Sequence, residues 1–188
     1  IDDAGRGPVI GPMVLAGVLI SQDIENEFIK LGIKDSKQLS PKKRRTLADE
    51  IKKLSVATHE VSISAGEIDG VNKDNLNLNQ REAVASAVII NKLSKLNKTK
   101  EKIKVIIDCP SVNINSWKSY LEKFLVAKTS LNIICEHKAD INYVVVSAAS
   151  IMAKVRRDSE IKKIKQDIGI DFGSGYSADP LTIKFIKD

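Results

Sequence analysis

Apolar residues along this chain form short continuous runs that alternate with stretches of helical spacing. Runs bounded by turn-forming or polar residues predict strands over Met13–Ile20, Val56–Ile63, Ile103–Asp108 and Leu131–Cys135. Apolar residues at helical spacing predict helices over Pro41–Leu54, Leu78–Leu96, Asn115–Val126 and Tyr143–Ile164. Ser40 and Pro41 are residues typical of a helix N-cap and first turn, so the first of these helices should begin there.

The order of these elements predicts an α/β fold with a mixed sheet flanked by helices. The early strands follow one another closely and can form hairpins, whereas the later strands are separated by helices and should pair in parallel. The 188 residues, of which 43% are hydrophobic, fit a single domain with a sizeable core. In sheets of this kind, sites gather at strand ends where the topology changes.

Charge and cysteine content narrow the classes of function. The formal net charge is +6, and basic clusters occur at residues 30–45, 92–104 and 154–165. Each cluster alone is typical of a solvated helix face, but together they favour a polyanionic partner. Cys109 and Cys135 lie far apart in apolar runs without a C-x-x-C pattern, so we expect buried free thiols rather than a disulfide scaffold or a zinc site.

The sequence shows neither a long apolar segment nor a signal-peptide pattern. No uninterrupted apolar stretch reaches the roughly eighteen residues of a membrane-spanning helix, so we expect no membrane association and a cytoplasmic location. The sequence does not begin with methionine, and we therefore expect a few residues to precede Ile1.

Two adjacent acids and a glycine-flanked arginine stand at the start of the chain. Asp2 and Asp3 are suited to a hard cation, and the segment Gly5–Gly7 brings Arg6 and a flexible backbone to the same place. This combination points to a metal ion beside a phosphate backbone, although two acids near a terminus are also typical of a solvated surface. The glycine spacing is not G-x-G-x-x-G and Pro8 follows directly, which excludes a dinucleotide-binding turn.

Two further acids follow predicted strands. Asp108 ends the run that begins at Ile103, where a parallel strand should leave the sheet, and Asp140 precedes the long helix. Either carboxylate could reach a metal over the strand ends. The alternatives are an ordinary turn aspartate before Pro110 for Asp108, and the N-cap of the long helix for Asp140.

Four blocks of this sequence resemble ribonuclease HII, the type 2 ribonuclease H, of the archaeal kind. They cover nearly the whole chain in order, and the first and third are long and specific. The blocks are Ile1–Met13, Asp35–Ser40, His137–Asp140 continued by Ser147–Asp158, and Gly173–Tyr176 continued by Asp179 and Pro180. Asp108 falls where the family has a strand-end aspartate.

The resemblance implies a ribonuclease H-like fold and an endonuclease that hydrolyses RNA in RNA/DNA hybrids and cuts at single ribonucleotides in duplex DNA. It implies one catalytic domain over residues 1–188, whose last part, from about residue 167, is a small helical extension that contacts substrate. The implied catalytic and metal-binding residues are Asp2, Asp3, Asp108 and Asp140. The family has glutamate at the second of these positions, so Asp3 is a departure that shortens the side chain by one methylene.

The implied cofactor is Mg²⁺ or Mn²⁺, with a two-metal site, because four carboxylates can hold two hard cations whose charges balance theirs. The implied substrate-binding residues are Gly5, Arg6, Gly7, Lys37, Lys154, Arg157 and Tyr176. For the lysines and Arg157 the alternative is a solvated or helix-stabilising charge, and for Tyr176 it is a half-buried surface ring. Ser177 and Ala178 depart from the family's usual Pro-Ser after this tyrosine.

Three hypotheses of function follow. The first is a metal-dependent endonuclease, in the form of a monomer, whose partner is an RNA/DNA hybrid or a ribonucleotide-containing duplex DNA. The second is a hybrid-binding form that is catalytically weakened by Asp3. The third is another nuclease or strand-transfer enzyme of the same fold. A sliding clamp is a further candidate partner, although the C-terminal sequence shows no clear motif for one.

Overall fold

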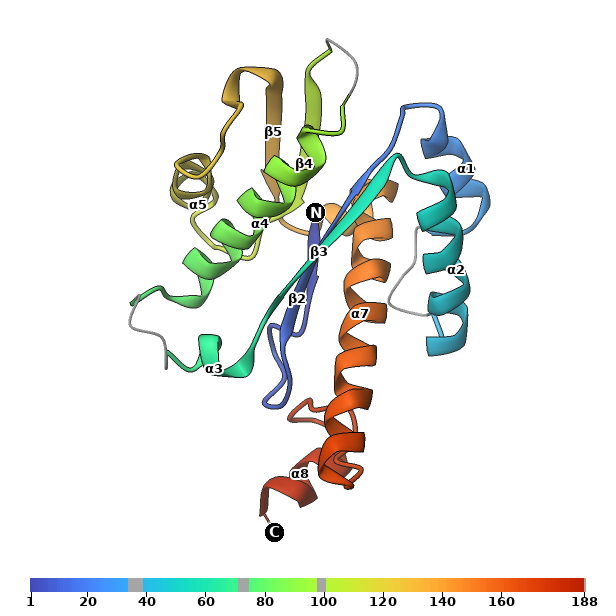
Figure 1. Cartoon of the computed structure of the whole chain (residues 1–188), viewed down its shortest axis with the longest axis vertical. Coiled ribbons are helices and arrows are strands. Elements are labelled where there is room, and N and C mark those ends of the chain that lie inside the picture. The colour runs from blue at the N-terminus through green and yellow to red at the C-terminus, as the bar shows by residue number, and fades with distance from the viewer. Residues whose placement is uncertain (34–38, 71–74, 98–100, 188) are drawn as a thin grey trace.

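The computed structural model describes residues 1–33, 39–70, 75–97 and 101–187 (Figure 1). The predicted strands and long helices are all present, with small differences in their ends. The elements are β1 Asp2–Ala4, β2 Met13–Leu19, α1 Ile24–Lys30, α2 Pro41–Leu54, β3 Ala57–Ile63, α3 Ala65–Ile68, α4 Leu78–Ser94, β4 Ile103–Asp108, α5 Ile114–Glu122, η2 Lys128–Ser130, β5 Leu131–Glu136, α6 Ala139–Asn142, α7 Val144–Ile168 and α8 Pro180–Lys187.

The strands form two sheets, one of three strands in the order β1-β2-β3 and one of two strands, β4 and β5. β1 pairs antiparallel with β2, β2 pairs antiparallel with β3, and β4 pairs parallel with β5, as the spacing of the strands predicted. Two hydrogen bonds join the two groups of strands: the Ile1 nitrogen donates to the Ile106 oxygen at 2.7 Å, and the Asp108 nitrogen donates to the Ile1 oxygen at 3.0 Å. These bonds place β1 beside β4, so the order across the two sheets is β3-β2-β1-β4-β5.

Helices cover both faces of the sheet, and the alternation of side chains along β2 shows how. Val14 and Ala16 pack into a core with α1, α2 and α7, whereas Met13 and Leu15 pack into a second core with α4. Figure 1 shows α7 and α2 on one side of β2 and β3, with α4 and α5 on the other side. Gly17 allows α4 to come close, because a Cβ there would lie 2.3 Å from Cγ2 of Ile89.

A third core lies beneath α4 and α5, where both helices cover β4 and β5. Trp117 and Leu121 of α5 meet Ala87 and Ile90 of α4 there. Cys109 and Cys135 belong to this core and are free thiols, with Cys109 buried and Cys135 half-buried. This agrees with the expectation from the sequence.

The C-terminal segment lies at the far end of α7, beside the loop that follows β1 (Figure 1). The backbone nitrogens of Val9 and Ile10 donate to the oxygen of Gly175 at 2.9 and 3.2 Å. The two ends of the sequence are therefore joined directly. Within the described ranges, no helix combines the length and apolar character needed to cross a membrane.

Candidate active site

Asp2 and Asp3 occupy β1, at the centre of the sheet, and adjacent strand residues point to opposite faces. Asp2 is only 6% exposed and accepts a hydrogen bond from the Ser150 side chain on α7. Burial raises the pKa of Asp2 to about 7, and the charges of Asp3 and Asp108 add to this effect against the opposing Ser150 bond. The carboxyl thus sits where a negative charge is costly unless a cation is present.

The Asp3 carboxyl faces α4 and has a similarly raised pKa. The pKa of Asp3 is raised to about 7, mainly by burial and then by the charge of Glu82, while the Arg6 guanidinium opposes the shift. Asp108 also raises the pKa of this group. Asp108 is therefore close enough to repel both carboxylates of β1, as expected if all three serve one site.

Asp108 holds the helical turn that carries Asp140. Oδ1 of Asp108 accepts a hydrogen bond from the backbone nitrogen of Ala139 at 3.2 Å, which holds the start of α6 against the end of β4. Asp140 lies in the first turn of α6 and is 6% exposed. The N-cap interpretation of Asp140 was wrong, because the short helix α6 intervenes and Tyr143 is the residue that precedes α7.

The described residues do not form a closed metal site. Among the described residues, no three acidic, histidine or cysteine side chains are gathered tightly enough to hold a metal ion by themselves. Hard carboxylate oxygens nonetheless suit Mg²⁺ and related cations, which retain several waters and also take oxygen ligands from a substrate. The chemistry of the donors, together with the raised pKa values of Asp2 and Asp3, fits a divalent cation.

Arg6 is anchored on α4 by two residues that the sequence analysis did not single out. Its Nη1 donates to Oε2 of Glu82 in an ion pair, and its Nη2 donates to Oδ1 of Asn79 at 2.8 Å. Glu82 is 1% exposed, and burial raises its pKa. Trp117 of α5 in turn donates from Nε1 to the Asn79 backbone oxygen at 2.9 Å, so both helices hold the arginine in place. Glu82 directly precedes the apolar-rich part of the predicted helix, from Ala83 to Ile90, and this position is the signal that could have identified it.

Comparison with known proteins decides the family. The family model described as "Ribonuclease HII" matches residues 1–188. This chain belongs to the ribonuclease HII family. The ribonuclease HII of Methanocaldococcus jannaschii is 43% identical over 194 residues, which cover 100% of this chain and 83% of the relative. That of Pyrococcus abyssi is 42% identical over 188 residues and is covered to 79% of its length, with all of this chain aligned.

Solved structures confirm the ribonuclease H-like α/β fold. The ribonuclease HII in the structure of the PCNA complex from Archaeoglobus fulgidus superposes with a TM-score of 0.84 at 39% identity, over 99% of this chain and 83% of that chain. The ribonuclease H2 of Pyrococcus horikoshii OT3 gives 0.84 at 37% identity with the same coverage. As a ribonuclease HII, this protein cleaves RNA in RNA/DNA hybrids and at ribonucleotides embedded in DNA.

Lys154 is the predicted substrate-binding lysine that the structure places beside the acids. Its Nζ donates to Oγ of Ser150 at 2.9 Å, and its charge lowers the pKa of Asp3. A cation at this position is suited to a phosphate, but the contact itself stays a prediction. Lys37, the other lysine expected to bind substrate in this ribonuclease HII, lies outside the described residues.

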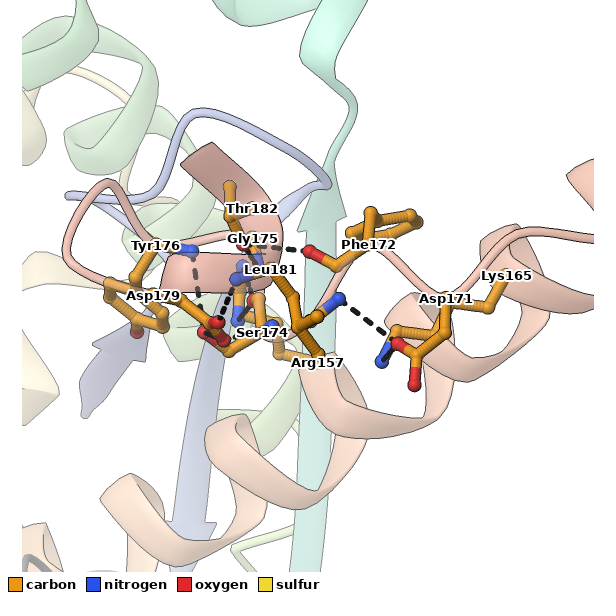
Figure 2. Close-up of polar contacts among 11 residues, drawn as sticks. Arg157, Lys165, Asp171, Phe172, Ser174, Gly175, Tyr176, Asp179, Leu181 and Thr182 are labelled. Carbon is orange, nitrogen blue, oxygen red and sulfur yellow. Dashed lines mark hydrogen bonds and ion pairs between the residues drawn. The ribbon is translucent and has the colours of Figure 1, made fainter. Parts of the chain in front are cut away.

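Gly5, Gly7 and Tyr176 lie in the two joined end segments, whereas Arg157 lies beneath them. Tyr176 is 42% exposed, while Arg157 is 3% exposed and its Cζ lies 4.8 Å from the centre of the Tyr176 ring (Figure 2). Gly5 has φ +97°, and a Cβ there would lie 2.6 Å from the oxygen of Pro12. The structure therefore brings the Gly-Arg-Gly loop and the tyrosine together over one buried arginine.

Proposed function

We propose that this ribonuclease HII hydrolyses its substrates with divalent cations held by Asp2, Asp3, Asp108 and Asp140. The observation that carries this proposal is the pKa of about 7 for both Asp2 and Asp3, with Asp108 contributing to both shifts. Raised carboxyl pKa values in a cluster are typical of sites that are completed by a cation. Mg²⁺ or Mn²⁺ in a two-metal arrangement would balance the four carboxylate charges.

Divalent cations held by Asp2, Asp3, Asp108 and Asp140 would supply an activated water and would stabilise charge on the phosphoryl oxygens, so that hydrolysis would leave 5′-phosphate and 3′-hydroxyl ends. The protein's own residues position the acids and the phosphate backbone for this reaction. Asp108 fixes the start of α6 through the Ala139 nitrogen, and Ser150 orients Asp2 from α7. Lys154 adds a positive charge on the side of α7, where it would meet the phosphate backbone.

Recognition of the ribonucleotide is assigned, within the same proposal, to Gly5, Arg6, Gly7 and Tyr176. The 2′-hydroxyl distinguishes RNA from DNA, so a backbone segment must approach the sugar closely. A Cβ on Gly7 would meet no atom within 4 Å, so its backbone borders open space. Tyr176 offers an exposed ring that can stack on a sugar or base.

The remaining predictions from the sequence belong to the same proposal. Residues from about 167 onward act as a substrate-contacting extension of one catalytic domain, supported by the Val9 and Ile10 bonds to Gly175. The enzyme acts as a cytoplasmic monomer. A sliding clamp is proposed as a partner on the basis of the Archaeoglobus structure of ribonuclease HII with PCNA, and co-elution of this chain with a clamp in size-exclusion chromatography tests it.

Three labelled duplexes test the proposed function: an RNA/DNA hybrid, a DNA duplex with one ribonucleotide, and the same duplex made of DNA alone. We expect Mg²⁺- or Mn²⁺-dependent cleavage of the first two, no cleavage of the third, and no activity with a chelator. Binding of the hybrid without cleavage in either metal would support the hybrid-binding form instead. Equal cleavage of the all-DNA duplex would indicate another nuclease of the same fold.

A further inference from the structure

Arg157 is a buried arginine on α7 whose guanidinium joins three separate segments. Its Nη2 donates to the backbone oxygen of Ile10 at 3.1 Å, and Nη1 and Nη2 each lie 3.4 Å from the backbone oxygen of Ser174, to which they donate. Only 3% of the residue is exposed. One side chain therefore connects the long helix, the loop after β1 and the C-terminal segment.

The same guanidinium supports the ring of Tyr176. The distance of 4.8 Å from Cζ of Arg157 to the ring centre is within the range of a cation–π interaction. Figure 2 shows the Arg157 side chain extending from α7 into the C-terminal segment that carries Tyr176. Because Tyr176 is 42% exposed, its ring retains free surface for a ligand while part of it rests on the arginine.

Glycines make room for the arginine on both sides. A Cβ on Gly5 would lie 2.6 Å from Nε of Arg157, and a Cβ on Gly175 would lie 3.3 Å from its Nη2. Gly5 belongs to the Gly-Arg-Gly loop and Gly175 directly precedes Tyr176. The two segments proposed to contact the ribonucleotide therefore pack on one guanidinium.

Hydrogen bonds within the C-terminal segment fix its shape around the ring. The nitrogen and Oγ of Ser174 donate to Oδ2 of Asp179, each at 2.7 Å. Oγ1 of Thr182 accepts from the Gly175 nitrogen at 3.0 Å and donates to the Phe172 oxygen at 2.8 Å (Figure 2). The segment is thus internally ordered, and Arg157 attaches it to α7.

We propose that Arg157 is a positioning residue that holds the Tyr176 ring at a fixed place relative to the Gly5–Gly7 loop. This role replaces the direct phosphate contact expected from the sequence, and it rests on the proposed function, in which both segments contact the same ribonucleotide. A planar guanidinium donates to two carbonyls in its own plane while its face supports a ring, which the ammonium of a lysine does not do. Arg157 therefore contributes to affinity for a single ribonucleotide through Tyr176.

A double-mutant cycle on the full chain tests this role. With the single-ribonucleotide duplex, Arg157→Lys should raise KM by about 2- to 30-fold, the range of a cation–π contact, with a smaller effect on kcat. In a Tyr176→Ala background the same substitution should change KM little, because its effect passes through the ring. If Arg157→Lys keeps its full effect without the ring, or if Tyr176→Ala leaves KM unchanged, the proposal is overturned.

Arg156→Lys is the matched control, since Arg156 is the neighbouring arginine on α7 with a side chain 44% exposed and paired with Glu160. The Arg156→Lys substitution should leave KM unchanged.

A second measurement needs no change at Arg157. The guanidinium NMR signal of Arg157 should carry a ring-current shift that Tyr176→Leu removes, and an unaffected signal overturns the contact. Failure of the unmodified protein to cleave would instead contradict the proposed function, so the two failures are distinguishable.

Discussion

Asp108 and Ala139 are joined by a hydrogen bond of 3.2 Å from the Ala139 backbone nitrogen to Oδ1 of the aspartate. This bond connects the end of β4 to the first residue of α6, and the next residue is Asp140. Asp108 thus has two effects: its charge acts on Asp2 and Asp3, and its side chain places Asp140. This one contact joins Asp108 to the helical turn that carries Asp140.

Replacing Asp3 by the glutamate that is typical of the family should raise Mg²⁺-dependent cleavage. The shorter aspartate leaves its oxygens about one carbon–carbon bond further back, and Mg²⁺ tolerates poor octahedral geometry badly. A misplacement of about 1 Å can cost roughly 10²-fold in rate. Single-turnover cleavage by the parent and by Asp3→Glu, in Mg²⁺ and in Mn²⁺, measures the effect.

The parent should depend more on Mn²⁺ than the Asp3→Glu variant does, while the affinity of the two proteins for substrate stays similar. If Asp3→Glu is slower than the parent in Mg²⁺, the site is adapted to aspartate, and the account of Asp3 as a handicap is wrong.

Glu82→Gln should weaken substrate binding through Arg6. The buried ion pair becomes a hydrogen bond from the guanidinium to a neutral amide oxygen, without the attraction of the carboxylate charge, so the guanidinium is held less firmly. We expect KM for the single-ribonucleotide duplex to rise about tenfold, equivalent to about 1.4 kcal/mol. The pKa of Asp3 should also fall, because the charge of Glu82 raises it in the parent. Steady-state kinetics across pH measures both changes, with the exposed Glu101→Gln as control.

Stability of the metal-free protein should fall as pH rises. Folding raises the pKa of Asp2 and Asp3 from 3.8 to about 7, so the folded state binds more protons than the unfolded state between these values. Stability is therefore greatest at the acidic end of this window and decreases as both groups ionise. Thermal unfolding in a chelator from about pH 5 to about pH 8 should show a decreasing Tm.

Mg²⁺ should offset this loss at the upper end of the pH range, because the cation takes the place of the protons. Asp2→Asn should reduce the slope in the chelator, since asparagine does not titrate. A Tm that increases with pH in the metal-free parent would show that Asp2 and Asp3 do not dominate the pH dependence of stability.

Tyr176→Ala should cost about 1–3 kcal/mol of binding to a single-ribonucleotide duplex, by analogy with aromatic stacking on bases. Because the ring is partly exposed, its removal should weaken substrate binding more than it lowers the stability of the fold. The loss should be larger for the single-ribonucleotide duplex than for a continuous RNA/DNA hybrid. Equilibrium binding to both substrates provides the comparison, and an equal small loss on both would leave Tyr176 as a packing residue.

Local sequence patterns predicted those elements that are stabilised locally. The helix Pro41–Leu54 has the predicted bounds because Ser40 caps it, accepting from the Lys43 nitrogen at 3.3 Å. Strand β4 also matches its prediction over Ile103–Asp108, since its apolar centre, Val105–Ile107, is typical of a strand covered on both faces. In these two segments, the residues that determine the secondary structure lie in the element itself or directly before it.

Elements that depend on distant partners were not predicted. β1 is three residues long and is a strand because it pairs with β2 and is joined to β4, neither of which periodicity reveals. α6 follows Lys138, which has a φ of +58°. Such a φ is typical of glycine, so the sequence gives no signal of the turn at this lysine. The placement of Asp140 and the pairing of Glu82 with Arg6 likewise arise from tertiary contacts, so the sequence alone predicted a set of acids but not the hydrogen bonds and ion pair around them.

Single-turnover cleavage of a DNA duplex with one ribonucleotide in Mg²⁺, by the parent, Asp108→Asn and Asp140→Asn, tests the carboxylate site most directly. We predict that each variant remains folded and loses at least about 10²-fold in rate, the scale of losing one preorganised electrostatic element. The exposed Asp23→Asn should retain the parent rate. A folded Asp108→Asn protein that cleaves at nearly the parent rate would contradict the assignment of these acids as the active site.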